Sequence, residues 1–172
     1  PPTNATTERA HEAAKNTNTR GVTQPLTEEI NDQTLERILD SVDLVGDGCD
    51  NFPTRFAVNR ACHARGIPLV SGAAVRWEGQ LTVFSGKPGD GCYRCLYSEE
   101  GEEEDTCSTT GVASPVVGVI GSLQATETLK VLTGAGEPLI NRLLIYDGLT
   151  AAWRSMKLRA DPNCPVCGDS DS

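Results

Sequence analysis

Two Cys-x-x-Cys pairs constrain this chain more than any other feature of its sequence. The first is Cys92-Tyr-Arg-Cys95, the second is Cys164-Pro-Val-Cys167, and 68 residues separate them. This spacing lets two thiolates from one tight turn reach a single ion, so the two pairs together can supply a closed tetrahedral zinc site. Because four protein sulfurs leave no open position, we expect the metal to be structural. It would fasten the C-terminal tail to a distant segment of the chain.

Two other interpretations of these cysteines stay open, namely disulfide bonds or two unrelated thiol pairs. A redox-active Cys-x-x-Cys pair normally begins a helix that follows a strand, whereas Cys164 and Cys167 lie in a tail with several prolines. The chain has seven cysteines, an odd number, so they cannot all pair with one another. This count favours metal or thiol chemistry in a reducing compartment, and we expect a cytoplasmic protein.

The three remaining cysteines differ in their surroundings. Cys62 falls on the apolar side of a predicted helix and is expected to fill space in the core. Cys49 stands directly before Asp50, and we assign it no chemistry. Cys107 follows an acidic segment and precedes a long predicted helix, whose positive N-terminal end would favour a nucleophilic thiolate. An inert surface cysteine is the alternative interpretation of Cys107.

Strand and helix patterns alternate along the middle of the chain. This alternation predicts one α/β domain over residues 1–172, with a largely parallel sheet and flanking helices. The predicted strands cover residues 22–26, 42–45, 68–71, 74–84, 143–147 and 151–158. The predicted helices cover residues 32–40, 51–65 and 112–132, with a short one around 8–15.

Two segments are expected to be mobile. Residues 1–20 are polar and weakly periodic. Residues 97–106 carry six acidic side chains, which repel one another and stay solvated.

The whole chain has a net charge of −9, the wrong sign for binding a nucleic-acid backbone. It has no uninterrupted apolar run of about 18 residues and no signal-peptide pattern at its start, so we expect neither a membrane span nor a leader.

Acidic residues mark the end of the strand predicted over residues 42–45. Asp47 and Asp50 flank this strand end, followed by Asn51 and then Arg55. A carboxylate at such an edge, beside a helix start, commonly holds magnesium bridged to phosphates. Helix capping by Asp50 and Asn51 would explain both residues more simply. The chain contains neither G-x-G-x-x-G nor G-x-x-x-x-G-K-[ST], so most of a phosphate-binding loop would come from elsewhere.

Six motifs in order closely resemble the ThiF/MoeB/HesA family, the bacterial and archaeal relatives of ubiquitin-activating enzymes. The resemblance is continuous from about residue 42 to residue 168 and weaker from about residue 10. The motifs are Asp47-Gly-Cys-Asp50-Asn51-Phe-Pro-Thr-Arg55, Pro68-Leu-Val-Ser-Gly-Ala-Ala-Val-Arg76-Trp-Glu-Gly-Gln80, Cys92-Tyr-Arg-Cys95, Thr106-Cys107 with Gly111-Val, Gly118-Val-Ile-Gly-Ser-Leu-Gln-Ala125 and Asn163-Cys-Pro-Val-Cys167.

The resemblance implies a Rossmann-like homodimeric enzyme that uses ATP and magnesium to adenylate the C-terminal glycine of a ubiquitin-like sulfur-carrier protein. Such enzymes serve thiamine, molybdopterin or tRNA-thiolation pathways, with a sulfur donor such as a cysteine desulfurase or a rhodanese. Asp50 then matches the magnesium-linked catalytic aspartate, Asn51 lies beside the nucleotide and Arg55 supports that region. Cys107 matches a cysteine that in some members forms an acyl-thio link to the carrier, and the paired cysteines match the structural zinc ligands Cys92, Cys95, Cys164 and Cys167.

The chain also departs from the family pattern. It has Asp-Gly-Cys-Asp-Asn where Asp-Cys-Thr-Asp-Asn is usual, and the family's ATP-contacting lysine would fall near Thr6. The glycine-rich nucleotide loop is missing, so the chain resembles the C-terminal two-thirds of such an enzyme, with a sheet incomplete at its N-terminus. We expect this chain alone not to adenylate. Two alternatives are a non-catalytic zinc-stabilised module that binds a ubiquitin-like partner and a thiol sulfurtransferase that works through Cys107.

Overall fold

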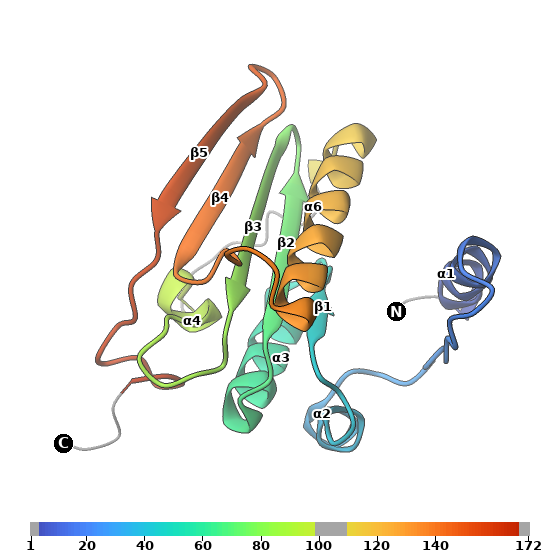
Figure 1. Cartoon of the computed structure of the whole chain (residues 1–172), viewed down its shortest axis with the longest axis horizontal. Helices are drawn as coiled ribbons and strands as arrows, with labels where there is room; N and C mark the ends of the chain where they lie inside the picture. The colour runs from blue at the N-terminus through green and yellow to red at the C-terminus, as the bar shows by residue number, and fades with distance from the viewer. Residues whose placement is uncertain (1–3, 99–109, 169–172) are drawn as a thin grey trace.

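A five-stranded sheet forms the centre of the protein. The computed structural model describes residues 4–98 and 110–168. The spatial order β1-β2-β3-β4-β5 follows the chain, and Figure 1 shows the strands side by side in this order. The strands are β1 (Val45–Asp47), β2 (Leu69–Val75), β3 (Glu78–Phe84), β4 (Arg142–Asp147) and β5 (Ala152–Lys157). β1 and β2 pair in parallel, and the other neighbours pair antiparallel.

Helices pack against both faces of this sheet. The helices are α1 (Asn4–Thr17), α2 (Asp32–Leu39), α3 (Phe52–Arg65), α4 (Tyr93–Leu96) and α6 (Ser114–Thr133). Leu69 packs with α2 and α3 in one apolar cluster, whereas the next residue, Val70, packs with Leu123 of α6 in another. Because successive side chains of a strand point to opposite faces, α3 and α6 lie on opposite sides of β2. Figure 1 shows α6 along the sheet and α1 apart from it.

Helix ends follow the capping signals of the sequence. The Asn31 side chain accepts a hydrogen bond from the Thr34 backbone N–H and caps α2. Asn51 caps α3 in the same way, through the Thr54 backbone N–H. Gly66, at φ 66°, ends α3 in the left-handed conformation that glycine adopts without strain. The prediction of an α3 helix from an Asn51 cap to Gly66 is therefore confirmed.

The α/β class with flanking helices is confirmed, but the sheet is mixed rather than mostly parallel. The single strand expected over residues 74–84 is a hairpin, because β2 ends at Val75 and the chain reverses through Arg76 and Trp77 before Glu78. Arg76 adopts a φ of 53° in this turn. A two-residue connection makes the following strand antiparallel. The predicted strand over residues 22–26 is wrong, since these residues have no regular structure and Val22 is 99% exposed.

Other predicted elements occur with shifted ends. The strand expected over residues 42–45 is β1, which begins later, and α1 is longer than the short helix expected around residues 8–15. The long helix predicted over residues 112–132 is α6, and the last two predicted strands are β4 and β5. Within the described part of the chain, no helix is both long and apolar enough to cross a membrane.

Candidate functional site

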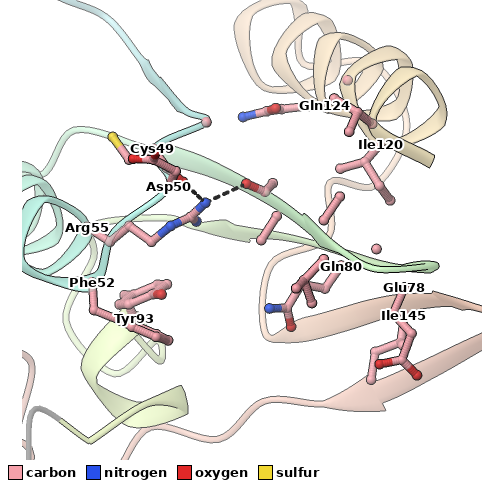
Figure 2. Close-up of a pocket in the computed structure, with 18 of the residues that line it drawn as sticks. Cys49, Asp50, Phe52, Arg55, Glu78, Gln80, Tyr93, Ile120, Gln124 and Ile145 are labelled. Atoms are coloured by element: carbon pink, nitrogen blue, oxygen red, sulfur yellow. Dashed lines mark hydrogen bonds between the residues drawn. The ribbon is translucent and has the colours of Figure 1, made fainter. Parts of the chain in front are cut away.

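A cleft of about 510 Å³ opens beside the C-terminal end of β1. Its walls come from the start of α3, from β2 and β3, and from α6 and β4. Figure 2 shows Cys49 and Asp50 at one end of the cleft and Glu78 and Ile145 at the other. Ligands of open α/β sheets bind in crevices at the carboxyl ends of parallel strands, and β1 with β2 forms such a pair. This cleft is therefore the candidate functional site.

A buried ion pair holds the loop between β1 and α3. Arg55 Nη1 donates to Asp47 Oδ2 at 2.9 Å, and the two side chains are 8% and 1% exposed. Arg55 Nη2 donates to the carbonyls of Cys49 and Gly72, the latter at 3.1 Å. The Ser71 hydroxyl donates to Asp47 Oδ2 at 3.1 Å. The guanidinium of Arg55 is therefore committed to protein groups.

Asp50 and Asn51 have different roles in the structure, although the sequence allowed both to be interpreted as helix-capping residues. Asn51 Oδ1 accepts the Thr54 backbone N–H at 2.9 Å and so caps α3. Asp50 accepts a hydrogen bond from Asn51 Nδ2 at 3.3 Å, and its side chain is exposed on the cleft. Capping therefore accounts for Asn51, whereas Asp50 presents a carboxylate to the cleft. Carboxylate oxygen is a ligand that magnesium prefers in proteins.

Gln124 of α6 holds the strands together at the same edge. Its Nε2 donates to the Asp47 carbonyl at 2.8 Å and to the Val70 carbonyl at 2.9 Å. A Cβ at Gly72 would lie 2.8 Å from Gln124 Oε1, so glycine is what lets this amide approach the sheet. Sequence reasoning included Gln124 in a motif but missed this role. One sequence signal could have indicated this role: Gln124 is an amide residue on the side of its helix that faces glycines of the neighbouring strands.

Two cysteines outside the Cys-x-x-Cys pairs have raised pKa values in this structure. Burial raises the pKa of Cys49 to about 12, and the Asp47 carboxylate acts in the same direction. Burial and the Asp47 charge also raise the pKa of Cys62 to about 12. Cys62 of α3 is 2% exposed and belongs to the apolar core cluster that contains Leu69, which confirms its predicted packing role. Cys107 and most of the predicted acidic loop lie outside the described residues.

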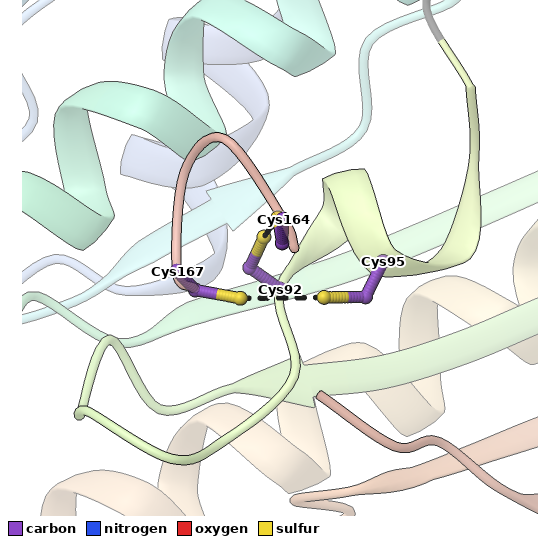
Figure 3. Close-up of side chains that lie close together, drawn as sticks. All are labelled: Cys92, Cys95, Cys164 and Cys167. Carbon is purple, nitrogen blue, oxygen red and sulfur yellow. Dashed lines mark hydrogen bonds between the residues drawn. The ribbon is translucent and has the colours of Figure 1, made fainter. Parts of the chain in front are cut away.

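The four paired cysteines come together, as Figure 3 shows. Their sulfurs all lie within 4.8 Å of one another, with Cys92 Sγ 3.7 Å from Cys164 Sγ and Cys95 Sγ 3.3 Å from Cys167 Sγ. A tetrahedron with Zn–S bonds of about 2.3 Å requires S–S separations of about 3.8 Å. A disulfide needs about 2.05 Å, and all four cysteines are free. The arrangement therefore fits a metal ion and contradicts the disulfide interpretation.

Backbone geometry supports this metal centre. The Cys95 N–H donates to the Cys92 carbonyl at 3.0 Å, and the Gly168 N–H donates to the Cys164 carbonyl at 2.9 Å. These bonds close the two tight turns. The Asp161 N–H points to Cys95 Sγ at 3.4 Å, as expected around a sulfur that carries negative charge. A Cβ at Gly168 would lie 2.6 Å from the Cys164 carbonyl oxygen, so the second turn requires glycine.

Asn141 joins the two halves of the metal centre. Its Oδ1 accepts the N–H of Gly91, the residue before Cys92, at 3.0 Å. Its backbone carbonyl accepts the N–H of Leu158, where the tail begins, at 2.9 Å. Asp90 accepts a hydrogen bond from Asn141 Nδ2 at 2.5 Å. The segments that carry the two cysteine pairs are therefore joined by hydrogen bonds to Asn141.

Comparison with known proteins agrees with this fold. Residues 3–166 match the ThiF family. The chain is 44% identical over 161 residues to molybdopterin-synthase adenylyltransferase of Escherichia coli K12, covering 94% of this chain and 65% of that protein. It is 42% identical over 147 residues to the E. coli K12 sulfur carrier protein ThiS adenylyltransferase, covering 86% and 58%. The chain thus spans less than two-thirds of the length of either relative.

A solved structure shows the same fold at lower identity. The crystal structure of E. coli MccB with ATP superposes with a TM-score of 0.76 at 23% identity, covering 95% of this chain and 51% of that one. This likeness shows the Rossmann-like fold alone. It shows nothing of the site, because sites can change while a fold persists.

Replacing Arg55 with Leu should lower the free energy of unfolding by about 3–5 kcal/mol, because Asp47 would stay buried without its partner. The matched control is Arg37→Leu, which removes an ion pair with Glu28 whose side chains are 56% and 52% exposed. That control should change the free energy by less than about 1 kcal/mol. Urea denaturation measures both variants, and equal losses would contradict the role given to Arg55.

The purified chain should contain about one zinc ion, and Cys164→Ser should lose most of it because a tetrahedral site needs all four sulfurs. Cys49→Ser, which changes a thiol outside the cluster, should keep the metal. Elemental analysis by mass spectrometry measures the zinc content. Full zinc in Cys164→Ser, or none in the unaltered chain, would refute the metal centre.

Proposed function

The chain belongs to the ThiF family, and on that premise we propose that it forms part of an enzyme that uses ATP to adenylate the C-terminal glycine of a ubiquitin-like sulfur-carrier protein. The relatives named above are adenylyltransferases for molybdopterin synthase and for ThiS. The observation that carries the proposal is the exposed Asp50 carboxylate in the cleft, on a loop held by the buried pair of Arg55 and Asp47. The product would serve thiamine, molybdopterin or tRNA-thiolation chemistry.

The chemistry explains why such a site is needed. A free carboxylate is a poor electrophile, so a carrier terminus cannot accept sulfur directly. In the adenylation the carboxylate oxygen bonds to the α-phosphorus of ATP and pyrophosphate leaves, which makes the glycine carbonyl open to attack by sulfur. Magnesium, when bound, neutralises charge on the phosphates. Asp50 would hold that ion at the edge of the cleft.

The start of α3 supplies a second element of this site. Asn51 caps the helix, and this cap keeps the first turn of α3 in place beside the cleft. The positive end of a helix favours an anion such as a phosphate group. We therefore propose that Asn51 lies beside the nucleotide. Arg55 contributes by holding the loop rather than by touching the ligand.

The four cysteines are proposed to bind zinc in a structural role. Four sulfurs fill the coordination sphere, so the ion would hold the tail without taking part in adenylation. A zinc-stabilised module that binds a ubiquitin-like partner without chemistry is the second candidate, because the clustered sulfurs would serve stability alone.

The proposal extends to partners and location. A homodimer is supported by exposed apolar side chains on α6, where Leu129 and Leu132 are 62% and 55% exposed. A cysteine desulfurase or a rhodanese would donate the sulfur. The odd cysteine count and the clustered thiols agree with a reducing, cytoplasmic environment.

Asp50→Ala should lower carrier-dependent exchange of pyrophosphate into ATP by about 100-fold or more, because a charged group at the phosphates is lost. The assay uses the product of the complete open reading frame that contains this sequence. Asp43→Asn is the control, since Asp43 is exposed and does not line the cleft. Unchanged exchange in Asp50→Ala would remove Asp50 from the chemistry. Carrier binding without any exchange would favour the binding module.

Cys107 is proposed to form an acyl-thio link to the carrier, in which its sulfur bonds to the acyl carbon of the adenylated glycine and AMP leaves. The link would be a carrier adduct that survives denaturant and breaks when excess thiol is added. Cys107→Ser should abolish the adduct, whereas Cys62→Ser should keep it because Cys62 is buried. Denaturing gel electrophoresis with and without thiol measures the adduct. Undiminished sulfur delivery in Cys107→Ser would exclude both this link and a sulfurtransferase that works through Cys107.

A further inference from the structure

Asn59, in the middle of α3, is a buried polar residue that the cleft does not use. Its side chain is 2% exposed. Its Oδ1 accepts the backbone N–H of Tyr93 at 3.0 Å. Its Nδ2 is buried and has no hydrogen-bond partner among the described residues. Because a buried amide N–H without an acceptor is costly and rare, this nitrogen points to a partner of another kind.

The cysteine that lies next along the chain to the group bound by Asn59 is Cys92. Tyr93, which Asn59 already binds, directly follows Cys92, and Cys92 is 1% exposed. The Asn59 amide therefore lies against the turn that begins at Cys92.

A metal-bound cysteine gives the orphan amide its acceptor. Coordination removes the thiol proton, and the sulfur then accepts hydrogen bonds from surrounding N–H groups. Two other sulfurs of the cluster already have such donors in the backbone N–H groups of Asp161 and Val166, at 3.4 and 3.5 Å. Asn59 Nδ2 would donate a hydrogen bond to Cys92 Sγ, as these backbone groups donate to Cys95 Sγ and Cys164 Sγ.

We propose that Asn59 is an outer-sphere positioning residue of the metal centre, with Nδ2–H donating to the metal-bound Cys92 sulfur while Oδ1 holds the Tyr93 N–H. The inference rests on the proposed metal centre. It has a consequence for the cleft, because Asn59 lies four residues after Arg55 and therefore on the same side of α3. One helix side thus binds the loop of the cleft through Arg55 and the metal centre through Asn59.

The first experiment replaces the metal with an NMR-active cadmium isotope in the unaltered chain. A through-bond coupling between cadmium and the Asn59 side-chain N–H is expected, because a hydrogen bond to the sulfur transmits it. The backbone N–H groups of Asp161 and Val166 provide the internal reference. Coupling to these two groups without coupling to Asn59 would overturn the inference and leave the metal centre intact. Failure of the chain to bind cadmium through sulfur would instead refute the metal centre itself.

The second experiment uses cobalt-loaded variants. Asn59→Asp keeps an acceptor for the Tyr93 N–H but loses the donor, and Asn59→Leu loses both. Both should shift the sulfur-to-cobalt charge-transfer band to longer wavelength and speed metal release to a chelator about ten-fold or more. Cys62→Ala is the matched control, since Cys62 is buried on the same helix outside the cluster, and it should leave band and release rate unchanged. An unchanged band in a folded Asn59 variant, or an equal shift in Cys62→Ala, would contradict the role.

Discussion

The buried pair of Arg55 and Asp47 is the interaction on which the candidate site depends. It lies where β1, β2 and the first turns of α3 meet, and it ties the carbonyls of Cys49 and Gly72 to the same guanidinium. A buried charge without a partner costs several kcal/mol, so the two residues and the loop between them stay together. That loop carries Asp50. The carboxylate therefore has its position before any ligand arrives, and a preformed site spends little binding energy on ordering itself.

Helix α3 connects this pair to the cysteine centre. Its N-terminal turn borders the cleft, and its middle packs against the turn that begins at Cys92. The C-terminal tail returns to the same place through Cys164 and Cys167, and Asn141 joins the two approaching segments. A structural metal would therefore act at a distance from the cleft but on the helix that shapes it. This arrangement gives a physical reason for a non-catalytic ion in a protein of this family.

Signals that act over a few residues predicted much of the fold. Asn51 and Gly66 mark the two ends of α3, and the Cys-x-x-Cys spacings predicted the cluster. The strand expected over residues 22–26 does not form, and among the described residues its apolar side chains lie outside the core, with Val22 99% and Leu26 38% exposed. The hairpin between β2 and β3 was missed because Arg76 turns the chain in a left-handed conformation without the glycine or asparagine that normally signals such a turn. Mixed pairing in the sheet follows from that reversal.

The sequence by itself determined which chemical groups the protein has and which of them lie in one turn, including the four thiols, the Asp50 carboxylate and the helix caps. Only the tertiary structure decided what each polar group contacts. It committed Arg55 to Asp47, left Asp50 exposed to the cleft, and bonded the amides of Gln124 and Asn59 to distant segments. The reason is physical. Capping and turn geometry depend on residues three or four apart, whereas burial and the partner of a buried group depend on which elements pack together.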